Sequence, residues 1–368
     1  MSSKSKADGN VRGFSLAGAI RTFSAAVGTS AVLMLTFCGI LDMILPPEGD
    51  SAQAASALAS VPAEEPMQVQ LGGDIFGIRM FSDGIIVSAV SDIYADGAAC
   101  CPAKDAGIRP GDYVLSANGQ PVKNNAALSG ILARGEAVTL TLRREEEIFE
   151  TTVTPRLCGD TYRAGMWIRD SAAGLGTVTF YTADGTEFAA LGHGICDADT
   201  RKLIALRAGE PADIALCGIE RGKAGAPGRL RGYFTGTDGF GVLTSNTQTG
   251  IFGTLPEPHR GELIDILPQE DAEPGPVQIA ATIDDNGVRL FDAELEKINR
   301  SKKQGPCALV IHITDPVLLE KTGGIVQGMS GSPILQDGKL LGALTHVFVE
   351  DPTRGYGIFI ENMLEAAG

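Results

Sequence analysis

Apolar and polar residues alternate over short stretches along most of the chain. Alternation over four to eight residues is typical of half-buried β-strands, and it is clear at 138–143 and 148–155. Glycine accounts for 47 of the 368 residues and is scattered among Val, Ile, Thr and Leu. This pattern predicts a mainly β protein with many short strands and tight turns.

One segment near the N-terminus departs from this pattern. Residues 23–41 carry no charge and are long enough to cross a hydrocarbon core. Basic residues precede the segment and acidic residues follow it, which places the N-terminus in the cytoplasm and the rest of the chain outside. We therefore expect a cytoplasmic tail and membrane anchor at 1–47 and a flexible Ala/Ser/Pro/Glu-rich linker at 48–69. The alternative is a signal peptide cleaved after Ala54 or Ala57, both of which end small-x-small triplets.

Composition narrows the classes of partner and cofactor. A net charge of −15 argues against a nucleic-acid partner. The hydrophobic content of 44% excludes a disordered chain. Only four histidines are present and they are scattered, so a metal-dependent hydrolase lacks its ligand cluster. Six cysteines follow the predicted anchor, and their spacing leaves the disulfide state open.

Residues 70–156 are organised like a small peptide-binding module. Asn118-Gly119 predicts a hairpin turn, and the string A-G-I-R-P-G-D-Y-V-L-S-A-N-G at 106–119 resembles a PDZ domain. Such domains take up a peptide as an added strand along a sheet edge. By this resemblance the peptide-binding loop is formed by Gly72, Gly73, Asp74, Ile75 and Phe76, with backbone amides that face the end or a turn of the peptide. The strands are expected at 85–90, 113–117, 138–143 and 148–155, and the second helix at 126–133.

Two motifs in the second half of the chain suggest nucleophilic catalysis. In A-A-L-G-H-G-I-C-D, His193 follows an apolar strand and lies between two glycines that let a partner approach the ring. In G-I-V-Q-G-M-S-G-S-P-I, the pattern around Ser330 resembles the nucleophile loop of chymotrypsin-like serine proteases. The amides of Gly328 and Ser330 would converge on an oxyanion. His346 is a second candidate base, which we interpret as structural or as pocket lining.

The order of the motifs resembles the SpoIVB sporulation serine peptidase family. It comprises the N-terminal span, the PDZ-like module, the two motifs above, N-T-Q-T-G-I-F-G and T-H-V-F-V-x-D-P-T-x-G-Y-G-I. The resemblance implies a chymotrypsin-like two-barrel peptidase at 157–368 that needs no cofactor. It also implies a signalling endopeptidase in the forespore intermembrane space. Its substrate would be the extracytoplasmic part of a regulator of an intramembrane metalloprotease, whose cleavage leads to sigma-factor activation. Members also cleave themselves near the N-terminus.

Carried over by residue, the resemblance implies a triad of His193, Asp315 and Ser330. Asp238 is the alternative acid, since it lies between base and nucleophile in the order usual for two-barrel proteases. The expected chemistry is hydrolysis through an acyl-enzyme. The alternative function is that of a catalytically silent adaptor, which binds a membrane-protein partner through the PDZ-like module. The retained serine, histidine and glycines argue against this alternative.

Overall fold

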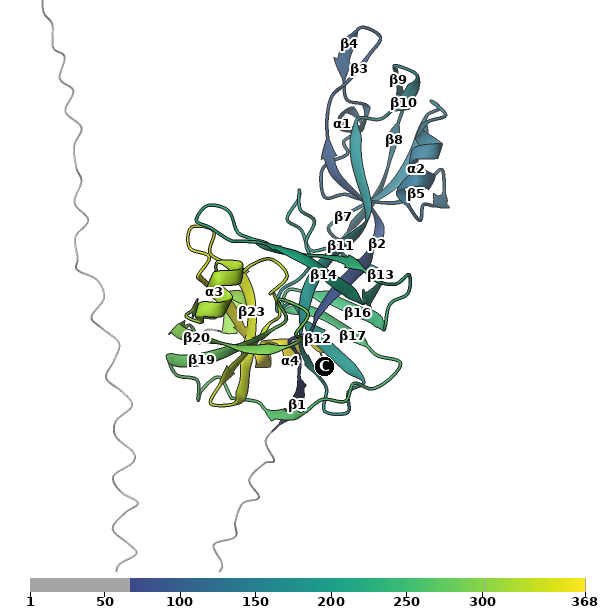
Figure 1. Cartoon of the computed structure of the whole chain (residues 1–368). Helices are drawn as coiled ribbons and strands as arrows, with labels where there is room; N and C mark the ends of the chain where they lie inside the picture. Colours follow the sequence, from purple (N-terminus) through teal and green to yellow (C-terminus); the bar gives the residue numbers. More distant parts are fainter. Residues whose placement is uncertain (1–66, 301, 368) are drawn as a thin grey trace, which may run out of the picture. The chain divides into compact units, whose positions relative to one another are not determined.

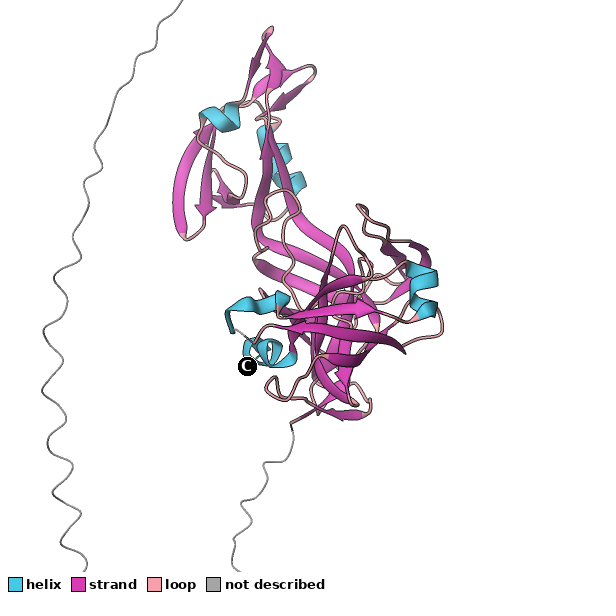
Figure 2. Cartoon of the chain, turned by 90° about the vertical axis from the view of Figure 1, so that its left-hand side faces the viewer, coloured by secondary structure: helices cyan, strands magenta, loops and turns pink. Residues whose placement is uncertain are grey.

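The computed structural model describes residues 67–300 and 302–367. The predicted anchor and nearly all of the predicted linker lie outside the described residues. Within them, no helix has both the length and the apolar character needed to cross a membrane. The described chain is mainly β, as the alternating pattern predicts (Figure 2).

The PDZ-like part packs two helices and several strands around one apolar core. Its most buried residues include Ile85, Val87, Leu128 and Leu140. Asn118 and Gly119 both have positive φ, 51° and 74°, so the predicted hairpin turn is present. The elements, shown in Figure 1, are β3 (Ile93–Ala95), β4 (Ala98–Cys100), α1 (Pro102–Asp105), β5 (Tyr113–Ala117), β6 (Gln120–Pro121), α2 (Asn125–Leu132), β7 (Val138–Arg144), β8 (Glu147–Val153), β9 (Arg156–Cys158) and β10 (Thr161–Arg163).

Two long strands, β2 (Ile75–Val90) and β11 (Met166–Tyr181), are shared by the PDZ-like part and the peptidase part. They pair antiparallel from Met166 opposite Val90 to Thr177 opposite Ile75. Ile85 and Val87 of β2 lie in the PDZ-like core, whereas Phe76 and Ile78 lie in a separate core with Val178 of β11. The two parts are therefore interleaved in sequence rather than divided at a single residue.

The first half of the peptidase part is an open sheet in the order β16-β17-β12-β11-β2, which continues into the PDZ-like strands. Strand β1 pairs with β11 and β18, and β13 pairs with β2. The further elements of this half are β1 (Gln68–Leu71), β12 (Glu187–Ala190), β13 (Leu206–Ala212), β14 (Ile214–Glu220), β15 (Arg229–Phe234), β16 (Val242–Thr247), β17 (Gly250–Thr254) and β18 (Leu263–Asp265).

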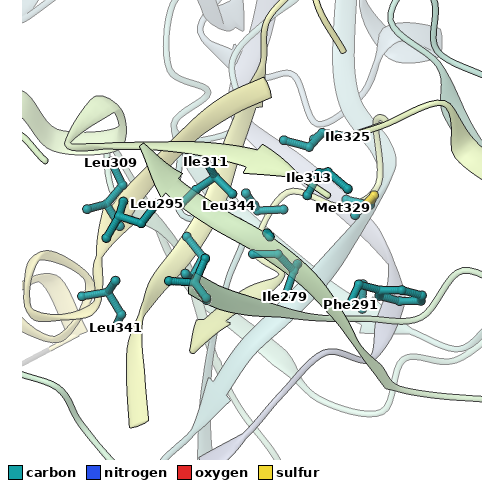
Figure 3. Packing of buried hydrophobic residues seen from close by; sticks show 14 of the residues in the cluster. Ile279, Phe291, Leu295, Leu309, Ile311, Ile313, Ile325, Met329, Leu341 and Leu344 are labelled. Atoms are coloured by element: carbon teal, nitrogen blue, oxygen red, sulfur yellow. The ribbon is translucent and has the colours of Figure 1, made fainter. Parts of the chain in front are cut away.

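The second half is a closed barrel in the order β19-β20-β21-β24-β23-β22. Branched and aromatic side chains fill it, as Figure 3 shows for Ile279, Phe291, Leu309 and Ile311. In the described part of the chain, one closed barrel is thus found where the sequence predicts two, and the other half is an open sheet. The elements are β19 (Gly275–Ala281), β20 (Arg289–Ile298), the 3-10 helix η1 (Lys302–Cys307), β21 (Leu309–Ile313), α3 (Pro316–Thr322), β22 (Pro333–Gln336), β23 (Lys339–Val347), β24 (Arg354–Phe359) and α4 (Ile360–Ala367).

Candidate active site

His193 lies on the loop at 191–205 between β12 and β13, called here the His193 loop. Close packing explains the two glycines beside it. Gly192 has φ of 66°, a left-handed conformation that favours glycine. A Cβ on Gly194 would lie 2.2 Å from Leu203 Cδ1 and 2.3 Å from the carbonyl oxygen of Thr247, so no side chain fits there. The glycines therefore let the loop press against its surroundings while the half-buried imidazole faces the cleft.

A side chain from β16 holds this loop in place. Asn246 Oδ1 accepts from the Ile195 amide at 2.8 Å, and Nδ2 donates to the carbonyls of Ile195 and Ile204 at 2.9 Å each. The amide side chain thus satisfies three backbone groups of the loop at once. In the sequence, Asn246 lies in the motif N-T-Q-T-G-I-F-G, which does not by itself indicate this role. A lone Asn among strand-forming residues was the signal that could have singled it out.

The hydrogen bonding of His193 determines which ring nitrogen is free. Its Nδ1 lies 3.0 Å from the carbonyl oxygen of Gly194. A carbonyl can only accept, so Nδ1 carries the proton and Nε2 keeps its lone pair. Burial lowers the pKa of His193 below its ordinary value, which favours the neutral ring. His193 is therefore in the state that a general base requires.

Ser330 lies on a loop that is anchored on both sides. Met329 is fully buried in the barrel core, and Figure 3 shows it beside Ile313 and Ile325. On the other side, buried threonines of β11 hold the loop carbonyls. Thr177 Oγ1 donates to the Gly328 carbonyl, and Thr179 Oγ1 to the Gly331 carbonyl, at 2.8 Å each.

The loop backbone leaves two amides available. Gly328 and Gly331 have φ of 103° and 94°, which few other residues adopt. From residue 327 to 332, the other four amides donate to backbone carbonyls. Among the described residues, the amides of Gly328 and Ser330 have no acceptor. These are the two donors expected to stabilise an oxyanion, and their free state suits that role.

Ser330 and His193 line one cleft of about 770 Å³ between the open sheet and the barrel. In the described structure each side chain bonds a backbone carbonyl and not the other: Ser330 Oγ donates to Thr345 O at 2.8 Å. The centroid of the His346 ring lies 4.7 Å from the centroid of the His193 ring, and His346 also lines the cleft. Catalytic hydrogen bonds are often formed only once substrate is present, so this arrangement is compatible with a serine nucleophile and a histidine base.

Comparison with known families decides the identity. A family model described as SpoIVB peptidase S55 matches residues 160–364, more than half of the chain. A PDZ domain model matches residues 93–144. The chain belongs to the SpoIVB peptidase S55 family. It is a serine peptidase with a PDZ domain, as the sequence motifs predict. No curated protein sequence matches the chain.

In this S55 peptidase the predicted triad acid, Asp315, makes its hydrogen bonds to helix α3 and not to His193. Asp315 is the N-cap of α3, and its Oδ1 accepts from the amides of Val317 and Leu318 at 2.9 Å each. Asp315 does not line the cleft, and no hydrogen bond joins it to His193 among the described residues. The alternative acid, Asp238, is exposed and also lies outside the cleft lining. The group that orients His193 in this structure is the Gly194 carbonyl.

The predicted peptide-binding loop of the PDZ domain also needs correction. The Gly72 amide donates to Thr179 O and the Gly73 amide to Val178 O, so neither is free for a peptide. A Cβ on Gly72 would lie 2.3 Å from Val178 O, which shows how tightly this segment packs on β11. Phe76 is buried in a peptidase core, and Asp74 and Ile75 line a separate pocket of the peptidase part. Residues 72–74 therefore connect β1 to β2 on the peptidase side, and Ile75 and Phe76 begin β2 of its sheet.

A groove of about 370 Å³ lies instead at the PDZ core, between α2 and the start of β11. Leu132 of α2 and Met166 of β11 are among its lining residues. In this region β11 pairs with β2 on one side, and no strand of the described chain pairs with its other edge. An open strand edge beside a helix is the arrangement that accepts an added peptide strand.

Proposed function

We propose that this S55 peptidase hydrolyses peptide bonds through an acyl-enzyme on Ser330, with His193 as the general base. The observation that carries the proposal is that both side chains line one cleft beside two amides that have no acceptor among the described residues. Ser330 Oγ exchanges its bond to Thr345 O for one to His193 Nε2 and attacks the scissile carbonyl carbon. The negative oxygen accepts from the amides of Gly328 and Ser330. No cofactor takes part.

His193 transfers protons in both halves of this reaction. It takes the Ser330 proton and gives it to the leaving amine as the peptide bond breaks. Water then attacks the acyl carbon, His193 accepts a proton from it, and that proton returns to Ser330 as the acid product leaves. The Gly194 carbonyl keeps the proton on Nδ1, the task that a carboxylate performs in a Ser–His–Asp triad. The proposal therefore replaces Asp315 with a backbone group.

The PDZ domain is proposed to hold an extended segment of the protein substrate. The groove between α2 and β11 supports this role, since a bound strand would extend the sheet at its open edge. Binding at this second place raises the effective concentration of a scissile segment in the same substrate.

The family and the sequence support a wider role in sporulation. We propose that residues 23–41 anchor the enzyme with its catalytic part in the forespore intermembrane space. There it would cleave the extracytoplasmic part of a regulator that restrains an intramembrane metalloprotease, which leads to sigma-factor activation. It would also cleave a second copy of itself within the linker.

Labelling with a fluorophosphonate tests the proposed chemistry directly. The wild-type protein is expected to be labelled on Ser330, and Ser330→Ala is expected to remain unlabelled. His193→Ala should lose labelling as well, since the serine then lacks its base. Absence of labelling in the folded wild-type protein, combined with retained peptide binding, would replace the peptidase mechanism with the silent adaptor.

A further inference from the structure

The charges that line the catalytic cleft are unusual for this acidic chain. The cleft is bounded by parts of β11, the His193 loop, the Ser330 loop and the end of β23. Arg201 is the one Lys, Arg, Asp or Glu among the lining residues in the described part of the chain, although the whole chain carries 45 acidic residues. A substrate therefore meets an apolar cleft with one positive group.

The mechanism fixes which wall faces which side of the scissile bond. The carbonyl oxygen lies at the amides of Gly328 and Ser330, so the preceding side chain (P1) falls against the walls beside that loop. The leaving amine must receive its proton from His193, so the residues after the bond lie toward the His193 loop. These two directions assign the cleft walls to substrate positions.

The P1 wall is apolar. Ile325, Val326, Val347 and Val349 line it. Ile325 Cδ1 lies 2.7 Å from where a Cβ on Gly355 would be, so the isoleucine packs against the bare face of that glycine. A charged P1 side chain would lose its water here without gaining a partner, and a very large one would meet Ile325.

The leaving side carries the positive charge. Arg201 lies on the His193 loop, is exposed and forms no ion pair among the described residues. The two acidic residues nearest to it in sequence are already paired, because Arg169 bonds Asp197 and Asp199. The Arg201 guanidinium is therefore available to a carboxylate of the substrate.

We propose that the cleft selects substrates with an apolar P1 residue of modest size followed by an acidic residue at one of the next two positions. This inference rests on the proposed Ser330–His193 mechanism, which defines the two sides of the bond.

Peptide hydrolysis by the full chain tests the selectivity. Quenched-fluorescence peptides share one Ala/Ser background and carry Leu, Lys or Asp at P1, and Glu, Gln or Lys at both following positions. With Leu at P1, kcat/KM is expected to exceed that for Lys or Asp by at least about tenfold. Glu after the bond should be preferred over Lys by about fivefold, the size of one exposed ion pair. Equal rates for Leu and Lys at P1 would overturn the proposal.

Reversing the charge of Arg201 isolates the second half of the proposal. Arg201→Glu is expected to invert the Glu-over-Lys preference after the bond and to leave the Leu-over-Lys ratio at P1 unchanged. The matched control is Arg260→Glu, an identical charge change at an exposed residue outside the cleft, which should alter neither ratio. An unchanged Glu-over-Lys ratio in Arg201→Glu would show that Arg201 does not determine the selectivity after the scissile bond.

Fluorophosphonate labelling separates failure of this inference from failure of the mechanism, because the probe reaches Ser330 without a peptide. Labelled enzyme that shows no selectivity among the peptides overturns the inference and leaves the mechanism standing. Folded enzyme that is not labelled overturns both.

Discussion

Two serines in one loop, Ser330 and Ser332, differ in the properties that nucleophilic attack requires. Ser330 lines the cleft, whereas Ser332 is fully buried and its Oγ has no hydrogen-bond partner in the described structure. We expect Ser330→Ala to lose about six orders of magnitude in kcat, as for other serine nucleophiles. Ser332→Ala should keep its activity and unfold at the same or a higher temperature, because it removes an unsatisfied buried hydroxyl. Peptide hydrolysis measures the activity of the two variants, and thermal unfolding measures their stability. The reverse pattern would move the nucleophile by two residues.

The protonation of His193 predicts the pH dependence of catalysis. The base must be neutral, and burial lowers the pKa of His193 below the ordinary value of about 6.5. We therefore expect kcat/KM to rise with pH through a midpoint below 6.5 and to stay high at pH 7. A midpoint above 6.5 in the pH profile would show that another group, or a raised His193 pKa, limits the reaction.

His346 provides the control for this profile. Burial, followed by the neighbouring His193, lowers the pKa of His346 to about 4, so a midpoint between 4 and 6.5 does not report its titration. His346→Gln should therefore leave the midpoint nearly in place. The low folded-state pKa values also affect stability. As the pH falls below about 6.5, the unfolded chain binds more protons at these histidines than the folded chain, so they reduce stability with falling pH.

At the scale of elements, β16 supports the catalytic base through one side chain. Asn246 makes three hydrogen bonds to the His193 loop, and Asn246→Ala removes all of them. Because a misplacement of about 1 Å at a catalytic group can cost about 10²-fold, we expect a loss of that order in kcat. Hydrogen exchange at the Ile195 amide should become faster in the same variant. Asn286→Ala removes an exposed Asn outside the cleft and should change neither quantity.

Substitutions of Asp315 distinguish its role as the N-cap of α3 from a catalytic role. As an N-cap, Asp315 can be replaced by Asn with little loss, whereas Asp315→Ala should lower the free energy of unfolding by about 1 kcal/mol. Since the Gly194 carbonyl holds His193 in this structure, Asp315→Asn should also retain activity. Denaturant unfolding and peptide hydrolysis measure the two effects. A loss of about four orders in kcat at unchanged stability would identify Asp315 as the triad acid after all.

These elements also show what could be read from the sequence. The turn at Asn118–Gly119 and the glycines around Ser330 are visible because their conformations depend on local residues. Asp315 followed by Pro316 is a helix-start signal, whereas a catalytic role for Asp315 is implied only by the family resemblance. The positions of Gly72 and Gly73 could not be read, because their partners Thr179 and Val178 lie about a hundred residues further along the chain.

At the scale of the whole molecule, one strand serves both functional parts. The first residues of β11 line the PDZ groove, and Thr177 and Thr179 further along it hold the loop of Ser330. The proposed substrate capture and the support of the nucleophile therefore depend on the same strand, whereas the sequence predicts that all of β11 belongs to the peptidase domain at 157–368. The predicted binding loop at 72–76 leads into the other shared strand, β2, whose first residues Phe76 and Ile78 lie in the peptidase core, whereas Ile85 and Val87 lie in the PDZ core.

The linker before residue 67 should be a substrate of the enzyme itself. Its composition, rich in Ala, Ser, Pro and Glu, suits an extended strand in a protease cleft. We expect cleavage in trans, because a linker joined directly to β1 would have to double back to reach Ser330. The cleft selectivity inferred above favours the bond after Ala63, an apolar residue followed by Glu64 and Glu65.

Mixing full-length Ser330→Ala protein with active enzyme tests this expectation, since the inactive chain serves only as substrate. Sequencing its new N-termini should give a soluble form that starts within residues 48–70, with Glu64 as the main start. The matched variant Glu64→Lys/Glu65→Lys in the Ser330→Ala chain should be cut more slowly at this bond. A start elsewhere in the linker would retain self-cleavage and count against the selectivity. If active enzyme leaves the inactive chain whole while cells trim it after Ala54 or Ala57, signal peptidase performs the processing, and a cleaved signal peptide replaces the membrane anchor.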